Sequence, residues 1–336
     1  MSRSLPSVAI VGASGAVGTE LIACLERRRF PLRQLRLFAS ARSAGRRLPY
    51  GGDSLPVEEL TEQALADTEI ALFSAGTAAS RRFVPQAVRA GTVVIDNSAA
   101  YRMDAEVPLV VPEVNADAIA AHRGVIANPN CVAIIAVVPL WPLHQAFGIR
   151  RIIAATYQAA SGAGAAAMQE LRESTRAALA GEAFSPRVLR HPYAFNLFSH
   201  DTAVDPESGA NEEETKVARE LRKIMRAPQL RISITCIRVP VLRAHAVALT
   251  VEFERAITAE AARALLAQAP GVRVVDDVGA NHFPMPVEAT GQGDVLVGRI
   301  RTDAGDPSGH SLALFVAGDQ LLKGAALNAV QIAERL

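Results

Sequence analysis

Short apolar runs alternate with helical stretches along the first third of the chain. Each run is followed by a small or polar residue, and the runs lie at 7–11, 35–39, 70–73, 93–95 and 125–127. The stretch 16–28 carries apolar residues at helical spacing directly after a glycine-containing turn. Strands and helices that alternate in this way are typical of βαβ units and predict a mainly parallel sheet. An opening of strand, tight turn and helix is usual for a dinucleotide-binding domain.

The apolar runs become longer from Ile149 onward. Strands are predicted at 151–158, 231–239, 246–253, 272–276 and 295–301, and helices near 164–180 and 212–225. We therefore expect an α/β chain that begins with a Rossmann-type domain over residues 1–130. A C-terminal helix within 318–336 completes that domain, and residues 131–317 form a second, α+β domain.

Composition narrows the possible partners. The 336 residues are 50% hydrophobic, enough for about two domains that each bury a core. Lys and Arg number 35 against 34 Asp and Glu, so no general attraction to nucleic acid or to an anionic membrane is expected. No apolar run approaches the roughly 20 residues of a membrane span, and residues 1–6 lack the features of a signal peptide. We expect a cytoplasmic protein.

The three cysteines, Cys24, Cys131 and Cys236, lie at no zinc spacing and cannot all be paired. We expect neither a disulfide framework nor a metal site. Cys24 and Cys236 lie within apolar segments and are interpreted as core residues.

A GxxGxxG turn formed by Gly12, Gly15 and Gly18 follows the first strand and opens the first helix. Glycine permits the close approach of a pyrophosphate, which the backbone N–H groups of the helix N-terminus can bind. The alternative is a tight turn that binds no ligand.

The second strand runs into Ser40, Arg42 and Ser43 without a carboxylate that could bind ribose hydroxyls. An arginine between two hydroxyls suits a 2′-phosphate, which favours NADP over NAD. Alternatively, Arg42 is a solvated side chain of a loop that also carries Arg46 and Arg47.

Cys131 follows a short strand and the residues Asn128, Pro129 and Asn130, at the start of a predicted buried helix over 131–146. A helix N-terminus lowers the pKa of a thiol. A thiolate beside a nicotinamide indicates a dehydrogenase that works through a thioester. A buried structural cysteine is the alternative.

A thiol nucleophile needs an acid/base group, and His245 is the best placed of seven histidines because it lies at a strand junction. A structural histidine is the alternative. Arg102, Lys216 and Arg238 could bind anions or be solvated charges. Because Glu213 and Lys216 are three positions apart, they could form an ordinary salt bridge on one helix face.

Taken together, these segments resemble the aspartate-semialdehyde dehydrogenase family, over essentially the whole chain and in the family's order. They are GASGAVG at Gly12, SARSAG at Ser40, FSAG at Phe73, DNSAAYRMD at Asp96, NPNC at Asn128, EEETK at Glu212, CIRVPVLRAHA at Cys236 and GDQLLKGAALNAVQIAE at Gly318. AFNLFSH at Ala194 and RVPVLRAHA at Arg238 are most similar to the branch found in plants and some bacteria.

The resemblance implies that the protein converts L-aspartyl 4-phosphate and NADPH to L-aspartate 4-semialdehyde, phosphate and NADP, on the route to lysine, methionine and threonine. It implies that Cys131 is the nucleophile, His245 the acid/base and Gln158 the residue that orients the acyl group. Arg102 and Lys216 would hold phosphate, Arg238 and Glu213 the substrate's carboxylate and amino groups, and Asn130 would line the pocket. The implied cofactor contacts are Gly12, Ala13, Ser14, Gly15, Ala16, Val17, Ser40, Arg42, Ser43, Ser74, Gly76, Asn97, Ser161, Gly162, Gln320 and Asn328. The family also implies a homodimer, or a tetramer of dimers, built on the sheet of the second domain.

The chain departs from the family's pattern at three places. Val132 and Ala133 replace hydroxyl residues after Cys131, and Val247 stands where the family commonly has Glu. The usual second glycine is missing at 77–80. Two alternatives remain: an N-acetyl-glutamyl-phosphate reductase, or a catalytically silent paralogue that binds NADP and acts as an interaction subunit.

Overall fold

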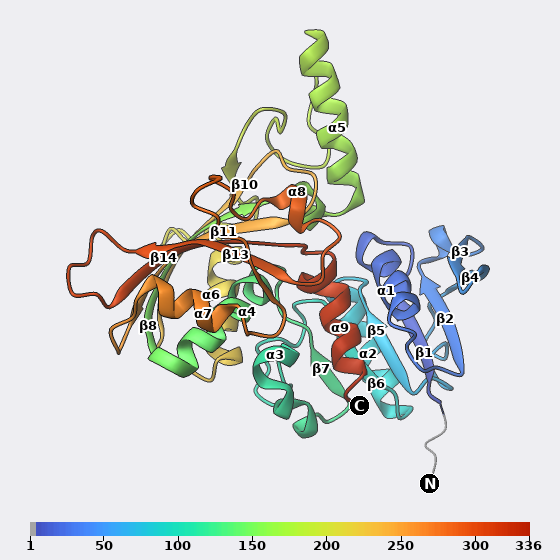
Figure 1. Ribbon diagram of the computed structural model, residues 1–336. Coiled ribbons are helices and arrows are strands. Elements are labelled where there is room, and N and C mark those ends of the chain that lie inside the picture. The colour runs from blue at the N-terminus through green and yellow to red at the C-terminus, as the bar shows by residue number, and fades with distance from the viewer. Residues whose placement is uncertain (1–4) are drawn as a thin grey trace. The chain divides into compact units, whose positions relative to one another are not determined.

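The computed structural model describes residues 5–336 and divides into two compact units (Figure 1). Of the described residues, the first unit comprises 5–130 and 325–336, and the second comprises 131–324. Residues 1–4, part of the segment in which no signal peptide is expected, lie outside the described residues.

The first unit is built on a seven-stranded sheet with the order β3-β4-β2-β1-β5-β6-β7. All neighbouring strands are parallel except β3 and β4, which form an antiparallel hairpin. The strands are β1 (Ser7–Val11), β2 (Gln34–Ala39), β3 (Arg47–Tyr50), β4 (Asp53–Glu59), β5 (Ile70–Phe73), β6 (Val93–Asp96) and β7 (Val125–Ala127). The helices are α1 (Ala16–Arg27), α2 (Thr77–Arg89), α3 (Pro112–Asn115) and α9 (Leu327–Ala333). Strand β1 is buried along its whole length, as expected of a central strand of a parallel sheet.

The second unit is built on a mixed sheet with the order β12-β13-β14-β11-β8-β10-β9. Its strands are β8 (Ile149–Gln158), β9 (Phe198–Ser199), β10 (Arg231–Arg238), β11 (His245–Phe253), β12 (Val272–Val274), β13 (Val295–Thr302) and β14 (Ser311–Gly318). Its helices are α4 (Cys131–Phe147), α5 (Ala165–Ala180), α6 (Glu212–Ile224), α7 (Ala259–Leu266) and α8 (Pro286–Ala289). Helices α4, α6 and α7 cover one face of this sheet, and α5 projects from it (Figure 1).

Helix α4 is the apolar centre of the second unit. Ten of its 17 residues are buried, from Val132 to Leu140 and at Leu143. It packs against β8, β11, β13 and β14, so its first residue, Cys131, is held by the most buried part of the unit. A helix that is apolar on all sides is expected to lie inside a core rather than on a surface.

The fold class is confirmed: an N-terminal dinucleotide-binding domain and a second α/β domain are both present. The β3–β4 hairpin and strand β14 were not predicted from the sequence. One helix was predicted over 318–336, whereas β14 continues to Gly318 and a short π-helix over Leu322–Ala326 precedes α9. Strand β14 lies between β11 and β13 in the sheet. Its pairing with these two strands extends it to Gly318, where the helix was expected to begin.

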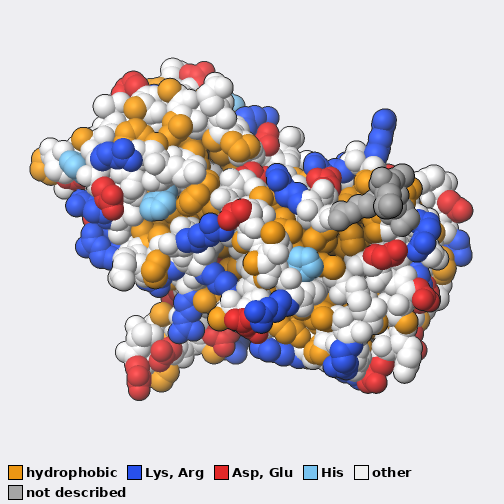
Figure 2. Space-filling view, turned by 90° about the horizontal axis from the view of Figure 1, so that it is seen from below, with side chains coloured by type: hydrophobic (Ala, Val, Ile, Leu, Met, Phe, Trp, Pro, Cys, Tyr) orange, Lys and Arg blue, Asp and Glu red, His pale blue; other side chains and the backbone are white. Residues whose placement is uncertain are grey.

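No helix within residues 5–336 is long and apolar enough to cross a membrane. On the face that Figure 2 shows, Lys and Arg side chains are interspersed with Asp and Glu instead of forming one basic area.

Candidate active site

The turn between β1 and α1 depends on its glycines. Gly12 has φ +87°, and a Cβ atom there would lie 2.3 Å from the carbonyl oxygen of Ser74. A Cβ atom at Gly18 would lie 2.2 Å from the carbonyl oxygen of Gly12. Gly15, which has no side chain, is the N-cap residue of α1, and the first turn of the helix contains no acidic residue. The turn is therefore tight, and the helix N-terminus favours an anion.

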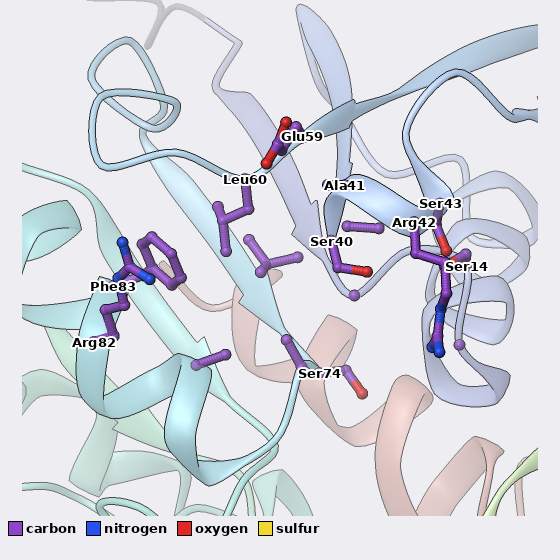
Figure 3. A pocket seen from close by; sticks show the side chains of 16 residues that line it. Ser14, Ser40, Ala41, Arg42, Ser43, Glu59, Leu60, Ser74, Arg82 and Phe83 are labelled. Carbon is purple, nitrogen blue, oxygen red and sulfur yellow. The ribbon is translucent and has the colours of Figure 1, made fainter.

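A pocket of about 500 Å³ lies beside this turn in the first unit (Figure 3). Of the predicted cofactor contacts, its walls contain Gly12, Ser14, Gly15, Ser40, Arg42, Ser43 and Ser74. Figure 3 shows Arg42 beside Ser14 at one end, and Arg82 beside Phe83 at the other. Glycines that admit a close backbone approach, together with hydroxyls and a guanidinium, fit a dinucleotide.

Two charged residues of this pocket were not predicted from the sequence. Glu59 lines it because β4 pairs with β2 in a register that places Glu59 opposite Ala39. A carboxylate therefore lies near the end of the second strand, but a neighbouring strand supplies it. Arg82 lines the pocket from α2. The Gly51-Gly52 pair, a common hairpin turn, was the sequence signal for β4.

Other predicted cofactor residues lie elsewhere in the first unit. Ala13 is fully buried, Ala16 and Val17 form the first turn of α1, and Gly76 precedes α2 with φ +84°. The second glycine that is usual in the family is missing at 77–80, and helix α2 starts there, at Thr77.

The amides of Asn97, Asn128 and Asn328 form a network within the first unit. Asn128 donates to Oδ1 of Asn97 at 2.9 Å, and Asn328 donates to Oδ1 of Asn128 at 2.7 Å. These contacts connect β6, β7 and α9, so the predicted cofactor residues Asn97 and Asn328 also hold the sheet ends together. Arg102 is buried beside them and donates to the carbonyl oxygens of Asn128 and Asn97. Asn130 is buried in the same unit.

The second unit contains the predicted nucleophile at a helix start. Cys131 is the first residue of α4 and is partly exposed, whereas Cys24 and Cys236 are buried. Their burial confirms that they are core residues, and it raises the pKa of both thiols. Val132 and Ala133 are fully buried, so the positions without hydroxyls belong to the core of α4.

His245 is the first residue of β11 and is completely buried. The backbone N–H of Ala159 donates to its Nδ1 at 2.9 Å, while its Nε2 has no hydrogen-bond partner within the described part of the chain. Burial, and then the charges of Arg238 and His200, lower its pKa well below the usual value. Beside the ring, Gly162 leaves room: a Cβ there would lie 3.0 Å from Nε2. His245 is therefore a buried, neutral imidazole.

Gln158 ends β8 next to Arg238, its register partner at the end of β10. The Gln158 carboxamide donates to Oε1 of Glu213 at 3.2 Å, and its oxygen accepts from Oγ1 of Thr156 at 3.0 Å. Glu213 and Gln158 are both buried. The contact between them brings two predicted site residues from α6 and β8 together.

Arg238 has an anionic partner that was not predicted from the sequence. Its Nε donates to Oδ1 of Asp201 at 3.2 Å, and its Nη1 donates to the carbonyl oxygen of Ala159 at 3.4 Å. Burial is the largest single influence on the pKa of Asp201 and raises it, but the charge of Arg238 and the hydrogen bonds to the carboxylate together outweigh burial, so that pKa is lowered. These two contacts hold the guanidinium in place, and only 4% of Arg238 is exposed.

Lys216 forms its ion pair with Glu212, not with Glu213 as the spacing suggested. The Nζ–Oε2 distance is 2.9 Å, and this contact lowers the pKa of Glu212. Residues four apart on a helix are neighbours in the same way as residues three apart, and the Glu213 carboxylate is directed to Gln158 instead. Lys216 and Arg219 line a cleft of about 340 Å³ at α6.

Gln320, Ser161 and Gly162, which were predicted as cofactor contacts, lie in the second unit around His245. Gln320 donates to Oγ of Ser161 and accepts from the backbone N–H of Ala244. Within residues 5–336 no cluster of three or more His, Cys, Asp or Glu side chains could hold a metal ion.

Comparison with known proteins identifies the family. The semialdehyde dehydrogenase NAD binding domain matches residues 7–122, and the semialdehyde dehydrogenase dimerisation domain matches residues 140–323. An aspartate-semialdehyde dehydrogenase of Synechocystis is 51% identical over 98% of this chain and 96% of its own. The chain belongs to the aspartate-semialdehyde dehydrogenase family.

Other members of the aspartate-semialdehyde dehydrogenase family agree in sequence and in structure. A relative from Aquifex aeolicus is 45% identical over 98% of this chain and 97% of its own. The structure of aspartate semialdehyde dehydrogenase II from Vibrio cholerae, complexed with ASA, has a TM-score of 0.96 at 40% identity and covers 99% of this chain and 98% of its own. Neither the reductase nor the silent paralogue is favoured by these comparisons.

Proposed function

We propose that this protein interconverts L-aspartyl 4-phosphate and L-aspartate 4-semialdehyde, with NADP as cofactor and a thioester on Cys131 as intermediate. The observation that carries the proposal is His245: a buried neutral imidazole whose Nε2 has no partner within the described part of the chain. It lies in the same unit as a thiol at the start of α4. The similarity to the Vibrio cholerae enzyme complexed with ASA supports the same substrate.

The substrate's charged groups match the buried charges of the second unit. Arg238 would hold the carboxylate and Glu213 the ammonium group, since both are fixed by neighbours before the substrate arrives. Gln158, held between Thr156 and Glu213, would orient the acyl group. Lys216 and Arg102 would each contribute to binding phosphate, as the family implies.

Cys131 would attack the acyl carbon and expel phosphate, leaving a thioester. The helix N-terminus favours the thiolate, so no base is required at this step. When bound, NADPH supplies the hydride that reduces the thioester carbon. His245 would donate a hydrogen bond from Nε2 to the oxyanion formed there, and the C–S bond would then break to release the aldehyde and the Cys131 thiolate.

The cofactor preference is proposed from the pocket at the glycine turn. Arg42, between Ser40 and Ser43, suits the 2′-phosphate of NADP. Glu59 is an exposed carboxylate in the same pocket. It disfavours NADP relative to NAD, because a carboxylate accepts hydrogen bonds from ribose hydroxyls and repels a phosphate.

The second unit would also form a homodimer, or a tetramer of such dimers. The sheet face opposite α4 has a shallow cleft of about 360 Å³, lined by residues that include Ile153, Thr235 and Phe315. Ile153 is 38% exposed. The match to the dimerisation domain covers this whole face. We expect Ile153→Asp to convert dimers to monomers in sedimentation velocity.

One assay tests the function. The protein is mixed with L-aspartate semialdehyde, NADP and inorganic phosphate, and reduction of NADP is followed for the wild type and for Cys131→Ala. We expect phosphate-dependent reduction by the wild type and none by the variant. If both proteins bind NADP and neither turns over, the chain is a silent paralogue.

A further inference from the structure

The bend that leads into His245 contains a residue in an unfavourable conformation. Ala244 has φ +72° and is completely buried. A left-handed conformation is unfavourable for a residue with a Cβ atom, so surrounding contacts must hold it. His245 begins β11 directly after this bend, and the bend therefore sets the direction in which the imidazole enters the site.

Backbone hydrogen bonds hold the first half of this bend. The N–H groups of Ala160 and Ser161 donate to the carbonyl oxygens of Val241 and Leu242, at 2.8 and 3.0 Å. The second half, Arg243 and Ala244, is held by side chains.

Those side chains belong to Asp319 and Gln320, the two residues that follow β14. Oδ2 of Asp319 accepts from Nε of Arg243 at 2.7 Å, and Oε1 of Gln320 accepts from the N–H of Ala244 at 2.9 Å. Asp319 is fully buried and also accepts from the N–H groups of Leu321 and Leu322. Gln320, 2% exposed, directs its amide nitrogen to Oγ of Ser161.

The same segment lies against the nucleophile. Gly324 donates its N–H to the carbonyl oxygen of Asp319. A Cβ atom at Gly324 would lie 3.0 Å from Cβ of Cys131 and 3.2 Å from Cβ of Gln320. The turn that starts at Asp319 therefore touches both the bend before His245 and the first residue of α4.

We infer that Gln320 is a positioning residue that sets the imidazole of His245 relative to Cys131. This differs from the cofactor contact that the family resemblance implied, because both ends of the carboxamide are used within the second unit. The inference deepens the proposed function and rests on it for its kinetic test.

The test compares Gln320→Met, which removes both hydrogen bonds at similar size, with Gln320→Glu. Glutamate retains the acceptor for Ala244, and the Ser161 hydroxyl can turn to donate to it. Gln292→Met, at an exposed position of the same unit, is the matched control. We expect Gln320→Met to lower kcat about 10- to 100-fold, as a misplaced catalytic group does. We expect Gln320→Glu to recover most of the loss, and the Kd of NADP to stay within about twofold, because a positioning residue acts through His245.

A second readout does not need activity. Long-range ¹H–¹⁵N spectra of the imidazoles report the tautomer of His245, whose signals are assigned by their loss in His245→Gln. We expect the Nε2–H tautomer alone in the wild type and a mixture in Gln320→Met. The inference is overturned if Gln320→Met weakens NADP binding as much as it lowers kcat, or if it leaves both kcat and the tautomer unchanged. An inactive wild type with the expected change of tautomer would refute the proposed function and leave the positioning role standing.

Discussion

The backbone N–H of Ala159 donates to Nδ1 of His245 at a distance of 2.9 Å. An imidazole nitrogen that accepts a hydrogen bond carries no proton, so the proton of the neutral ring lies on Nε2. Ala159 follows Gln158, so the residue that we propose to orient the acyl group is the chain neighbour of the one that fixes the tautomer. His245 is arranged to donate a hydrogen bond to an oxyanion rather than to remove a proton from a thiol.

The lowered pKa of His245 predicts how stability depends on pH. In the unfolded chain this histidine takes up a proton near its ordinary pKa of about 6.5, whereas in the folded state it stays neutral to lower pH. The unfolded state then binds more protons, so the free energy of unfolding falls as the pH decreases below about 6.5. Between about pH 7 and pH 5.5 we expect His245 to contribute a loss of about 1 kcal/mol.

Urea unfolding of the wild type and of His245→Gln at both pH values measures this contribution. His200, whose pKa is lowered by burial and by Arg238, is present in both proteins and cancels in the comparison. An equal loss of stability in the two proteins would show that His245 titrates normally in the folded state.

The hydroxyl of Thr156 is expected to matter for catalysis although it is buried behind Gln158. It donates to Oε1 of Gln158 and accepts from the N–H of Ile237 at 3.3 Å. Thr156→Val removes the hydroxyl at equal shape and should lower kcat/KM about 10-fold, equivalent to the loss of one buried hydrogen bond. Thr156→Ser should retain most of the activity. If the serine variant is as impaired as the valine variant, the methyl group and not the hydroxyl is what Gln158 needs.

A side chain at Gly324 should displace the nucleophile. In Gly324→Ala the new methyl group would lie 3.0 Å from Cβ and 3.3 Å from Cα of Cys131, closer than carbon atoms normally approach. We expect kcat to fall by about 100-fold while NADP binding is retained. Gly279→Ala, where the nearest atom is Oδ1 of Asp277 at 3.5 Å, serves as the control. Full activity of Gly324→Ala would mean that α4 starts elsewhere in the working enzyme.

Arg42 and Glu59 should set the cofactor preference in opposite directions. Arg42→Met removes the proposed partner of the 2′-phosphate and should lower the ratio of kcat/KM for NADP to that for NAD about 10- to 100-fold. Glu59→Gln should raise the same ratio. Arg46→Met, on the same loop but outside the pocket walls, is the control. A ratio that is unchanged in Arg42→Met would identify Arg42 as a solvated loop residue.

The sequence was sufficient for features that depend on local chemistry. The apolar run before Gly12, the glycine spacing and the apolar stretch after Cys131 are each contained in one segment, and the structure has a strand, a tight turn and a buried helix there. The burial of Cys24 and Cys236 follows from their apolar neighbours in the same way.

Features that depend on pairing between distant segments could not be predicted. Glu59 enters the cofactor pocket because β4 pairs with β2, and its own strand reads as polar, with a proline and three acids. Asp201 reaches Arg238 from a segment 37 positions away. The choice of Glu212 over Glu213 as the partner of Lys216 depends on Gln158, which occupies the other carboxylate. In each case a tertiary contact, not a local preference, decides the outcome.

The central claim is that Cys131 carries the acyl group. The measurement is rapid acid quenching of the protein with L-aspartate semialdehyde and NADP in phosphate-free buffer, followed by intact and peptide mass spectrometry. The wild type and Cys24→Ala should gain the mass of one aspartyl group on the peptide that contains Cys131, with a matching burst of NADPH, and Cys131→Ser should show neither. An aspartyl group on another residue, or turnover by Cys131→Ser at the wild-type rate, would contradict the account.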